Sequence, residues 1–120
     1  MLLPEALGLR VYLHCAPVDM RRQRNGLAAL ARTVIGDEVF SGALFCFIGR
    51  RRDKLKILYW HRNGFVAWCK VIEGAEKFPW PKRGEDVAVS LTAKQLAWLL
   101  EGIDVWKMKP HRVLNFSHIG

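Results

Sequence analysis

The sequence predicts a single α+β domain, in which an antiparallel sheet of about four strands carries two helices packed on one face. Three observations predict it. A chain of 120 residues that is 51% apolar and 25% charged suits one globular domain that needs no disulfide or metal to fold. Short β-branched and aromatic runs follow one another at hairpin spacing, and two further segments have helical spacing. We expect the domain over residues 9–104, between a lead-in of residues 1–8 and a basic tail of residues 105–120.

The first two elements are a strand and a helix. Residues 9–15 are rich in β-branched and aromatic side chains and predict a strand. Apolar residues then recur at helical spacing over residues 20–35. Alternatively, Asn25 caps a shorter helix over residues 26–35, and the residues before it form a separate turn. Gly36 is suited to the position after the last helical turn in either case.

Three strands are expected to follow as a meander. Residues 43–48 form a continuous apolar run of strand length. A basic turn leads to a second strand over residues 55–60, and residues 65–73 form the returning strand. The Asn63–Gly64 pair between them predicts a two-residue type I′ turn, which needs positive φ at both central positions.

The predicted turn fixes the register of this hairpin. Both faces of the hairpin then carry apolar side chains, so we expect a helix to cover one face and something else, such as a partner, to cover the other. The register gives two characteristic pairs: Tyr59 with Trp68 on one face, and Leu58 with Cys69 on the other.

The last part of the domain combines a rigid connection, a short strand and a helix. Residues 74–85 contain prolines and connect to a short strand over residues 87–91. Thr92 and Gln95 have the spacing of a capping box at the start of a helix. The helix is expected to end near Gly102, and its apolar side is formed by Leu96, Leu99, Leu100 and Ile103.

Two clusters of basic residues are the main candidates for a binding site. The chain carries 19 Lys and Arg against 11 Asp and Glu, a net charge of +8, which favours polyanions such as nucleic acid. Consecutive arginines at a turn can grip phosphates with paired hydrogen bonds, although a solvated turn and a solvated helix face would also be basic. The first cluster is Arg50, Arg51, Arg52, Lys54 and Lys56; the second is Arg21, Arg22 and Arg24, with Arg32 further along the predicted helix.

Three tryptophans are candidates for stacking or partner contact. Trp60 lies on the same predicted strand face as Lys54 and Lys56, an arrangement suited to stacking single-stranded bases. Packing in the core is the alternative for this ring. Trp80 and Trp106 are candidates for contact with a protein partner.

The sequence favours neither a metal site nor catalysis. Its three cysteines, Cys15, Cys46 and Cys69, include no C-x-x-C pair and lie among apolar neighbours, which predicts reduced, buried thiols in a cytoplasmic protein. The histidines lack metal-site spacing, the acids are scattered, and no phosphate-binding glycine loop is present. We therefore expect no cofactor, no enzymatic activity and no membrane partner.

Several short stretches together resemble one protein family. They are DMR (19–21), GLAALA (26–31), SGALF (41–45), RRRDKLKILYW (50–60), NGF (63–65), FPWP (78–81) and LTAKQLAWLLEGID (91–104). In order and spacing they resemble the TnpB accessory proteins of the insertion-sequence 66 family (IS66) over roughly residues 10–104. The resemblance implies a factor needed for transposition, with the recombination chemistry supplied by a separate transposase. Arg24 and Asn25 depart from the family pattern, which has an aromatic residue and an aspartate there, and His61 replaces an acid or a small polar residue.

These observations predict a non-catalytic accessory factor that binds DNA, or a transposase–DNA complex, through the basic hairpin at residues 50–56. The alternative is a protein-interaction module that docks onto the transposase or self-associates, with no direct DNA contact. A third possibility is a copy that has drifted and lost its function. The DNA-binding hypothesis depends on whether the cluster at residues 21–24 meets the one at residues 50–56 in the folded chain.

Overall fold

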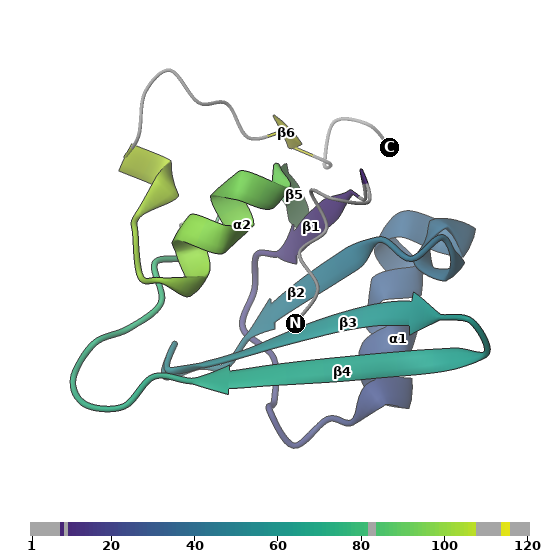
Figure 1. Cartoon of the computed structure of the whole chain (residues 1–120), viewed down its shortest axis with the longest axis horizontal. Coiled ribbons are helices and arrows are strands. Elements are labelled where there is room, and N and C mark those ends of the chain that lie inside the picture. Colours follow the sequence, from purple (N-terminus) through teal and green to yellow (C-terminus); the bar gives the residue numbers. More distant parts are fainter. Residues whose placement is uncertain (1–7, 9, 82–83, 108–113, 116–120) are drawn as a thin grey trace.

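The computed structural model describes residues 8, 10–81, 84–107 and 114–115. Its core is a six-stranded sheet in the order β4-β3-β2-β1-β5-β6, shown in Figure 1. The α+β class is confirmed. The strands are β1 (Val11–His14), β2 (Leu44–Ile48), β3 (Lys54–His61), β4 (Gly64–Val71), β5 (Ala88–Leu91) and β6 (Leu114–Asn115), and the helices are α1 (Arg24–Ile35) and α2 (Ala93–Leu100).

The sheet is mixed, and this corrects the expectation of an antiparallel sheet of about four strands. β1 pairs in parallel with β2, with Val11 opposite Leu44 and Leu13 opposite Cys46, whereas the other pairs are antiparallel. The reason is the connection between β1 and β2. It is long enough to contain α1, and a crossover with a helix returns the chain parallel to the strand it left.

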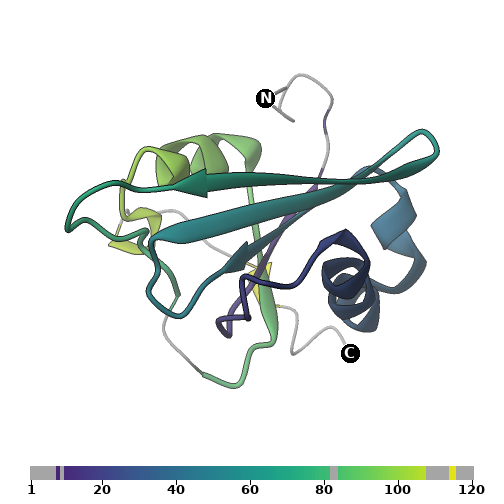
Figure 2. The same cartoon turned by 90° about the horizontal axis from the view of Figure 1, so that it is seen from below.

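The two helices lie on opposite faces of the sheet, not on one face as predicted (Figure 2). α1 packs Leu27 and Ala31 onto a cluster that includes Phe45 and Phe47. α2 contributes Leu96 and Leu99 to a second cluster, which includes Val11, Leu13, Cys46 and Ile57. The central strands are apolar on both sides: every residue of β2 is buried. A sheet of this kind needs a cover on each face, and the two helices supply both.

The β3–β4 hairpin forms as predicted, but its register differs. His61 pairs with Gly64, Tyr59 with Val66 and Ile57 with Trp68, so the two turn residues are Arg62 and Asn63. Of these two, only Arg62 has a positive φ, at 59°, which is not the pattern of a type I′ turn. The predicted pairs of Tyr59 with Trp68 and Leu58 with Cys69 are therefore wrong by two positions, a shift that keeps each side chain on its own face.

The helix starts were predicted with unequal success. α2 has the expected capping box: the Gln95 amide donates to the Thr92 hydroxyl at 3.0 Å, and the Thr92 amide donates to Oε1 of Gln95 at 2.9 Å. α1 begins at Arg24 after an extended Gln23 that makes no side-chain cap. Asn25 is thus inside the first turn and is not the N-cap. Ile103, expected on the apolar side of α2, is 41% exposed.

The chain continues beyond α2 in contact with the core. Val105 begins the short 3-10 helix η3 (Val105–Lys107) and is 2% exposed in the α2-side cluster. β6 pairs with β5 further on. The rest of the predicted tail, and the lead-in apart from residue 8, lie outside the described residues. No helix in the part of the chain that the structure describes is long and apolar enough to cross a membrane.

The three thiols differ in accessibility. Cys15 and Cys46 are buried, as predicted, but Cys69 on β4 is exposed, because β4 is the outer strand of the hairpin. Burial, together with the Asp86 carboxylate, raises the pKa of Cys15 to about 11. Burial alone raises the pKa of Cys46. Since the thiolate is the nucleophile, the two buried thiols are protected twice, by access and by protonation.

We expect iodoacetamide at pH 8 to alkylate Cys69 in the folded protein, and Cys15 and Cys46 only after unfolding. Peptide mass spectrometry over a time course, with and without guanidinium, measures this. Equal rates for Cys46 and Cys69 in the folded protein would contradict the strand order given above.

Candidate nucleic-acid interface

The turn between β2 and β3 presents the first basic cluster, and its shape is fixed by backbone hydrogen bonds. The Gly49 amide donates to the Lys54 carbonyl at 3.0 Å, and the Arg52 amide donates to the Gly49 carbonyl at 2.9 Å. Arg52 has φ 61°, a conformation that is uncommon for a residue with a side chain. Its carbonyl accepts a hydrogen bond of 2.8 Å from the Phe78 amide, which holds the turn against the following connection.

The segment between β1 and α1 docks directly against this turn. The Val18 amide donates to the Ile48 carbonyl at 2.8 Å. Lys56 reaches across from β3, and its Nζ donates to the carbonyls of Met20 and Arg22 at 2.8 and 3.0 Å. Packing is close, because a Cβ added to Gly49 would lie 2.7 Å from Cγ of Met20. These contacts join two parts of the chain about 30 residues apart in sequence.

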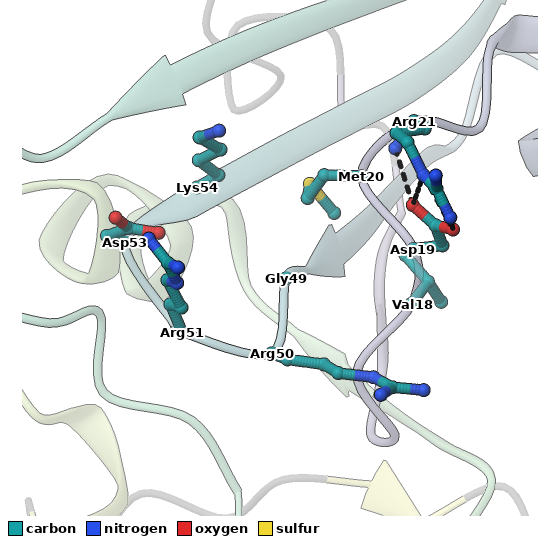
Figure 3. Close-up of a pocket in the computed structure, with 9 residues that line it drawn as sticks. All are labelled: Val18, Asp19, Met20, Arg21, Gly49, Arg50, Arg51, Asp53 and Lys54. Carbon is teal, nitrogen blue, oxygen red and sulfur yellow. Dashed lines mark hydrogen bonds and ion pairs between the residues drawn. The ribbon is translucent and has the colours of Figure 1, made fainter.

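A pocket of about 440 Å³ lies where the two segments meet. Figure 3 shows that its wall comes from the 18–21 segment on one side and from the β2–β3 turn on the other. The two basic clusters predicted from the sequence therefore converge at one place. The lining residues are Val18, Asp19, Met20, Arg21, Gly49, Arg50, Arg51, Asp53 and Lys54.

The cations of the pocket differ in how far they are neutralised. Arg21 folds onto Asp19, with Nη2 at 2.7 Å from Oδ2, and both groups are exposed. This hydrogen-bonded guanidinium holds the pKa of Asp19 well below its usual range. Among the described residues, Arg50, Arg51 and Lys54 make no ion pair within 4.0 Å, and all three are exposed. The pocket therefore presents cationic donors that an anion can use.

More exposed basic residues adjoin the pocket. The Arg22 side chain lies beside the first turn of α1: a Cβ added to Gly26 would be 3.8 Å from it. Arg24, at the start of α1, lines a second hollow of about 450 Å³ together with Lys56 and residues of β4. We define the basic surface by the exposed cations in this region: Arg21, Arg22, Arg24, Arg50, Arg51 and Lys54.

Two residues of the predicted clusters have other positions. Arg52, which has a positive φ, is half-buried and does not line the pocket. Lys56 is also half-buried, and its ammonium group holds the 20–22 segment in place. Lys56 is thus a positioning residue for the basic surface and is less available to a ligand than Lys54.

The three candidate tryptophans lie in different environments. Trp80 is 5% exposed in the α2-side core, and its indole donates to the His14 carbonyl at 3.0 Å, so it offers no ring to a partner. Trp106 is half-buried against the same cluster. Trp60, also half-buried, lies at the far end of the hairpin and packs edge-on against Phe40 and Phe65, with ring centroids 5.3 and 5.0 Å apart.

Several residues of this region were not predicted from the sequence. Asp19 and Asp53 bring negative charge to the pocket, and Phe40 and Phe65 accompany Trp60. An Asp two residues before an Arg is a local signal that was available for Asp19. Phe40 follows α1 by five residues, and nothing local indicates that it meets the hairpin. Within the described part of the chain, no group of three His, Cys, Asp or Glu side chains is placed to hold a metal ion.

Comparison with known proteins identifies the family. A family model described as "IS66 Orf2 like protein" matches residues 9–110. The uncharacterized protein y4jC of Sinorhizobium fredii is 32% identical over 102 residues, which cover 85% of this chain and 86% of that protein. The uncharacterized protein y4hO of the same species is 31% identical over 106 residues, covering 88% and 90%. No solved structure matches. The resemblance seen in the sequence is confirmed, and the chain belongs to the IS66 Orf2-like (TnpB) family of proteins associated with the transposition of insertion sequences.

Proposed function

We propose that this chain is a non-catalytic accessory factor of transposition that binds the DNA backbone through its basic surface. The observation that carries the proposal is the convergence of residues 18–22 with the 49–54 turn, which gathers exposed cations around one pocket. Membership of a transposition-associated family supports DNA as the polyanion. The net charge of +8 would steer the chain towards any duplex.

The arrangement suits phosphates better than bases. Arg50 and Arg51 project from a turn whose backbone is fixed by hydrogen bonds, so little backbone freedom is lost when they bind. A guanidinium can grip a phosphate with two parallel hydrogen bonds. Contacts of this kind position a protein on DNA without reading sequence. Binding is therefore expected to vary little with sequence and strongly with salt concentration.

Electrophoretic mobility shifts across a salt series test the proposal. The purified chain is titrated into duplexes carrying the ends of its element and into random duplexes of equal length. We expect both kinds of duplex to be retarded at low salt. The logarithm of the association constant is expected to fall linearly with the logarithm of the salt concentration. If no duplex is retarded at low salt, the chain does not bind DNA by itself.

Asp19 gives a prediction of opposite sign to that for the cations. Its carboxylate forms an ion pair with Arg21 and would repel a phosphate at the pocket. Asp19→Asn removes the charge but keeps an oxygen for the Arg21 amide, which donates to Oδ1 at 2.9 Å. We expect the affinity for duplex DNA to rise roughly fivefold at low salt, measured by fluorescence anisotropy.

Asp104→Asn is the matched control for this change. Asp104 also accepts a backbone hydrogen bond, from Trp106, and also faces a cation, Lys107, but it lies beyond α2. We expect its DNA affinity to equal that of the unaltered protein. A fall in affinity for Asp19→Asn would mean that Arg21 needs its carboxylate partner to bind, contrary to the proposal.

A protein-interaction role is the second candidate, and the β4 edge favours it. β4 ends the sheet on one side, pairs regularly with β3 along all eight residues, and exposes Val66 and Val71. Lys70, a charge that could protect such an edge, instead donates from Nζ to the Leu100 carbonyl at 2.6 Å. An extended strand of the transposase or of a second copy could add to this edge.

Co-purification with the cognate transposase, together with light scattering of the purified chain, tests this second role. We expect Val66→Lys to weaken either association without lowering the duplex affinity, because the added cation lies in the hollow lined by Arg24 and outside the pocket. If the association survives Val66→Lys, then β4 is not the interface.

A further inference from the structure

Three aromatic side chains form a partly exposed group at the end of the β3–β4 hairpin. Phe40, at the end of the 3-10 helix η2 (Gly36–Phe40), is 41% exposed. Its ring centroid is 5.3 Å from that of Trp60 and 5.7 Å from that of Phe65. Trp60 and Phe65 are half-buried and directly paired across the hairpin. We call these three residues the aromatic group.

The aromatic group is flanked by a guanidinium. Arg32 of α1 lies over the Phe40 ring, with Cζ 5.4 Å from the ring centroid. Arg32 also pairs with Asp37 at 3.1 Å, but both side chains are mainly exposed, at 60% and 84%. An exposed pair of this kind contributes little stability, so a phosphate can replace the carboxylate at low cost.

Two hollows connect the aromatic group with the basic surface. Arg24 and Lys56 line the hollow of about 450 Å³ together with Phe65. Phe65 also lines another hollow, of about 360 Å³, with Phe40 and Arg32. Lys54 and Lys56 point to the same face of β3 as Trp60, by the two-residue period of a strand. The pocket at Lys54 and the aromatic group are thus about 20 Å apart along β3, at roughly 3.3 Å per residue.

We propose that this face binds a single-stranded segment of nucleic acid, with its phosphates along Arg24 and Arg32 and a base stacked on the aromatic group. The inference rests on the proposed function and adds the class of ligand. A basic track beside exposed rings is the arrangement by which proteins hold unpaired strands without reading sequence. A duplex keeps its bases stacked inside, so it can use the cations but not the rings.

The physical alternative is that the three rings only attach η2 to the hairpin. Both roles use the same contacts within the protein, but they differ in their dependence on bases. A structural role predicts the same affinity for a strand with bases and for one without them. Stacking predicts a difference, because the ring contacts the base and not the phosphate.

The test compares two oligonucleotides of equal length and charge. One is oligo(dT), and the other has the same backbone with abasic sites throughout. Fluorescence anisotropy at fixed salt gives both affinities, and a duplex of the same length is measured in parallel. We expect the unaltered protein to bind oligo(dT) roughly tenfold more tightly than the abasic strand.

Phe40→Leu is the diagnostic variant, because it keeps an apolar contact with Trp60 and removes the flat ring. We expect it to lose most of the preference for oligo(dT) and to keep the duplex affinity of the unaltered protein. Trp60→Phe keeps a ring at its position and is expected to keep the preference. The thermal unfolding midpoint of each variant is measured to establish that it is folded.

The outcomes separate this inference from the proposed function. Equal affinity of the unaltered protein for oligo(dT) and the abasic strand, with duplex binding intact, would overturn the stacking role alone. A preference for oligo(dT) that survives in folded Phe40→Leu would also overturn it. Absence of binding to all three nucleic acids would overturn the proposed function and the inference together.

Discussion

Replacing Arg50, Arg51 and Lys54 together with glutamine is expected to lower the affinity for duplex DNA on the order of 100-fold at low salt. The three side chains are exposed and line one pocket. Each lost contact between an exposed cation and a phosphate removes about 1 kcal/mol, so the three together give a loss on the order of 100-fold. If each cation neutralises one phosphate, the slope of log K against log salt concentration should fall by about 2.7. Anisotropy titrations at several salt concentrations measure both quantities.

Two single variants serve as controls for the loss of charge. Arg52→Gly removes a neighbouring cation that does not line the pocket, and glycine accepts the positive φ of this position. Lys94→Gln removes a cation from α2, on the opposite face of the sheet. We expect each to change the affinity less than threefold. A loss of affinity in the controls as large as in the triple variant would mean that net charge, and not the pocket, determines binding.

Phe45→Ala is expected to cause the largest loss of stability, about 3–5 kcal/mol. Phe45 is fully buried in the central strand β2, and its ring stacks on Phe47 at 5.0 Å and lies 6.0 Å from Tyr12. Truncation leaves a cavity in the α1-side cluster that the surrounding sheet cannot fill. Because a domain of this size is stable by only about 5–15 kcal/mol, much of the total would be lost. Guanidinium denaturation followed by circular dichroism measures it.

Phe40→Ala is the matched control, since the same ring is removed from a partly exposed position. Phe40 is 41% exposed and outside both buried clusters. We expect a loss of about 1 kcal/mol or less from its ring contacts. Equal losses for the two variants would show that Phe45 does not lie in the core described above.

Local patterns in the sequence predicted the elements well. The apolar run at residues 43–48 became β2 because a strand buried on both faces needs no polar alternation. The capping box at Thr92 and Gln95 formed because both partners are within one turn of each other. Each of these patterns lies within a few consecutive residues, so the sequence alone is enough to predict the strand and the helix start.

The arrangement of the elements was predicted less well, because it depends on contacts distant in sequence. The crossover through α1 makes β1 and β2 parallel, and the length of that connection was a signal that could have indicated it. The hairpin register is another case. Asn63–Gly64 favours one turn, but the pairing of Ile57 with Trp68 on the α2 face requires another. Cross-strand packing outweighed the turn preference.

The candidate site shows the same limit. Both basic clusters were visible in the sequence, but their convergence depends on the bonds from Lys56 to the Met20 and Arg22 carbonyls. From the sequence alone, a lysine on a strand face such as Lys56 is predicted to contact a ligand. In the folded chain, the ammonium group of Lys56 donates to two backbone carbonyls and holds Arg21 beside the pocket. The aromatic group likewise needs η2 to meet the hairpin.

The most direct test of the DNA-binding proposal is an amide chemical-shift map of the uniformly labelled protein titrated with a short duplex. We expect the largest changes at residues 18–24 and 49–54, which surround the pocket. Small changes are expected on α2, which covers the opposite face of the sheet, and on β5, which is separated from β2 by β1. Saturating changes centred on α2, or no changes at all at low salt, would contradict the claim that the converged basic surface binds DNA.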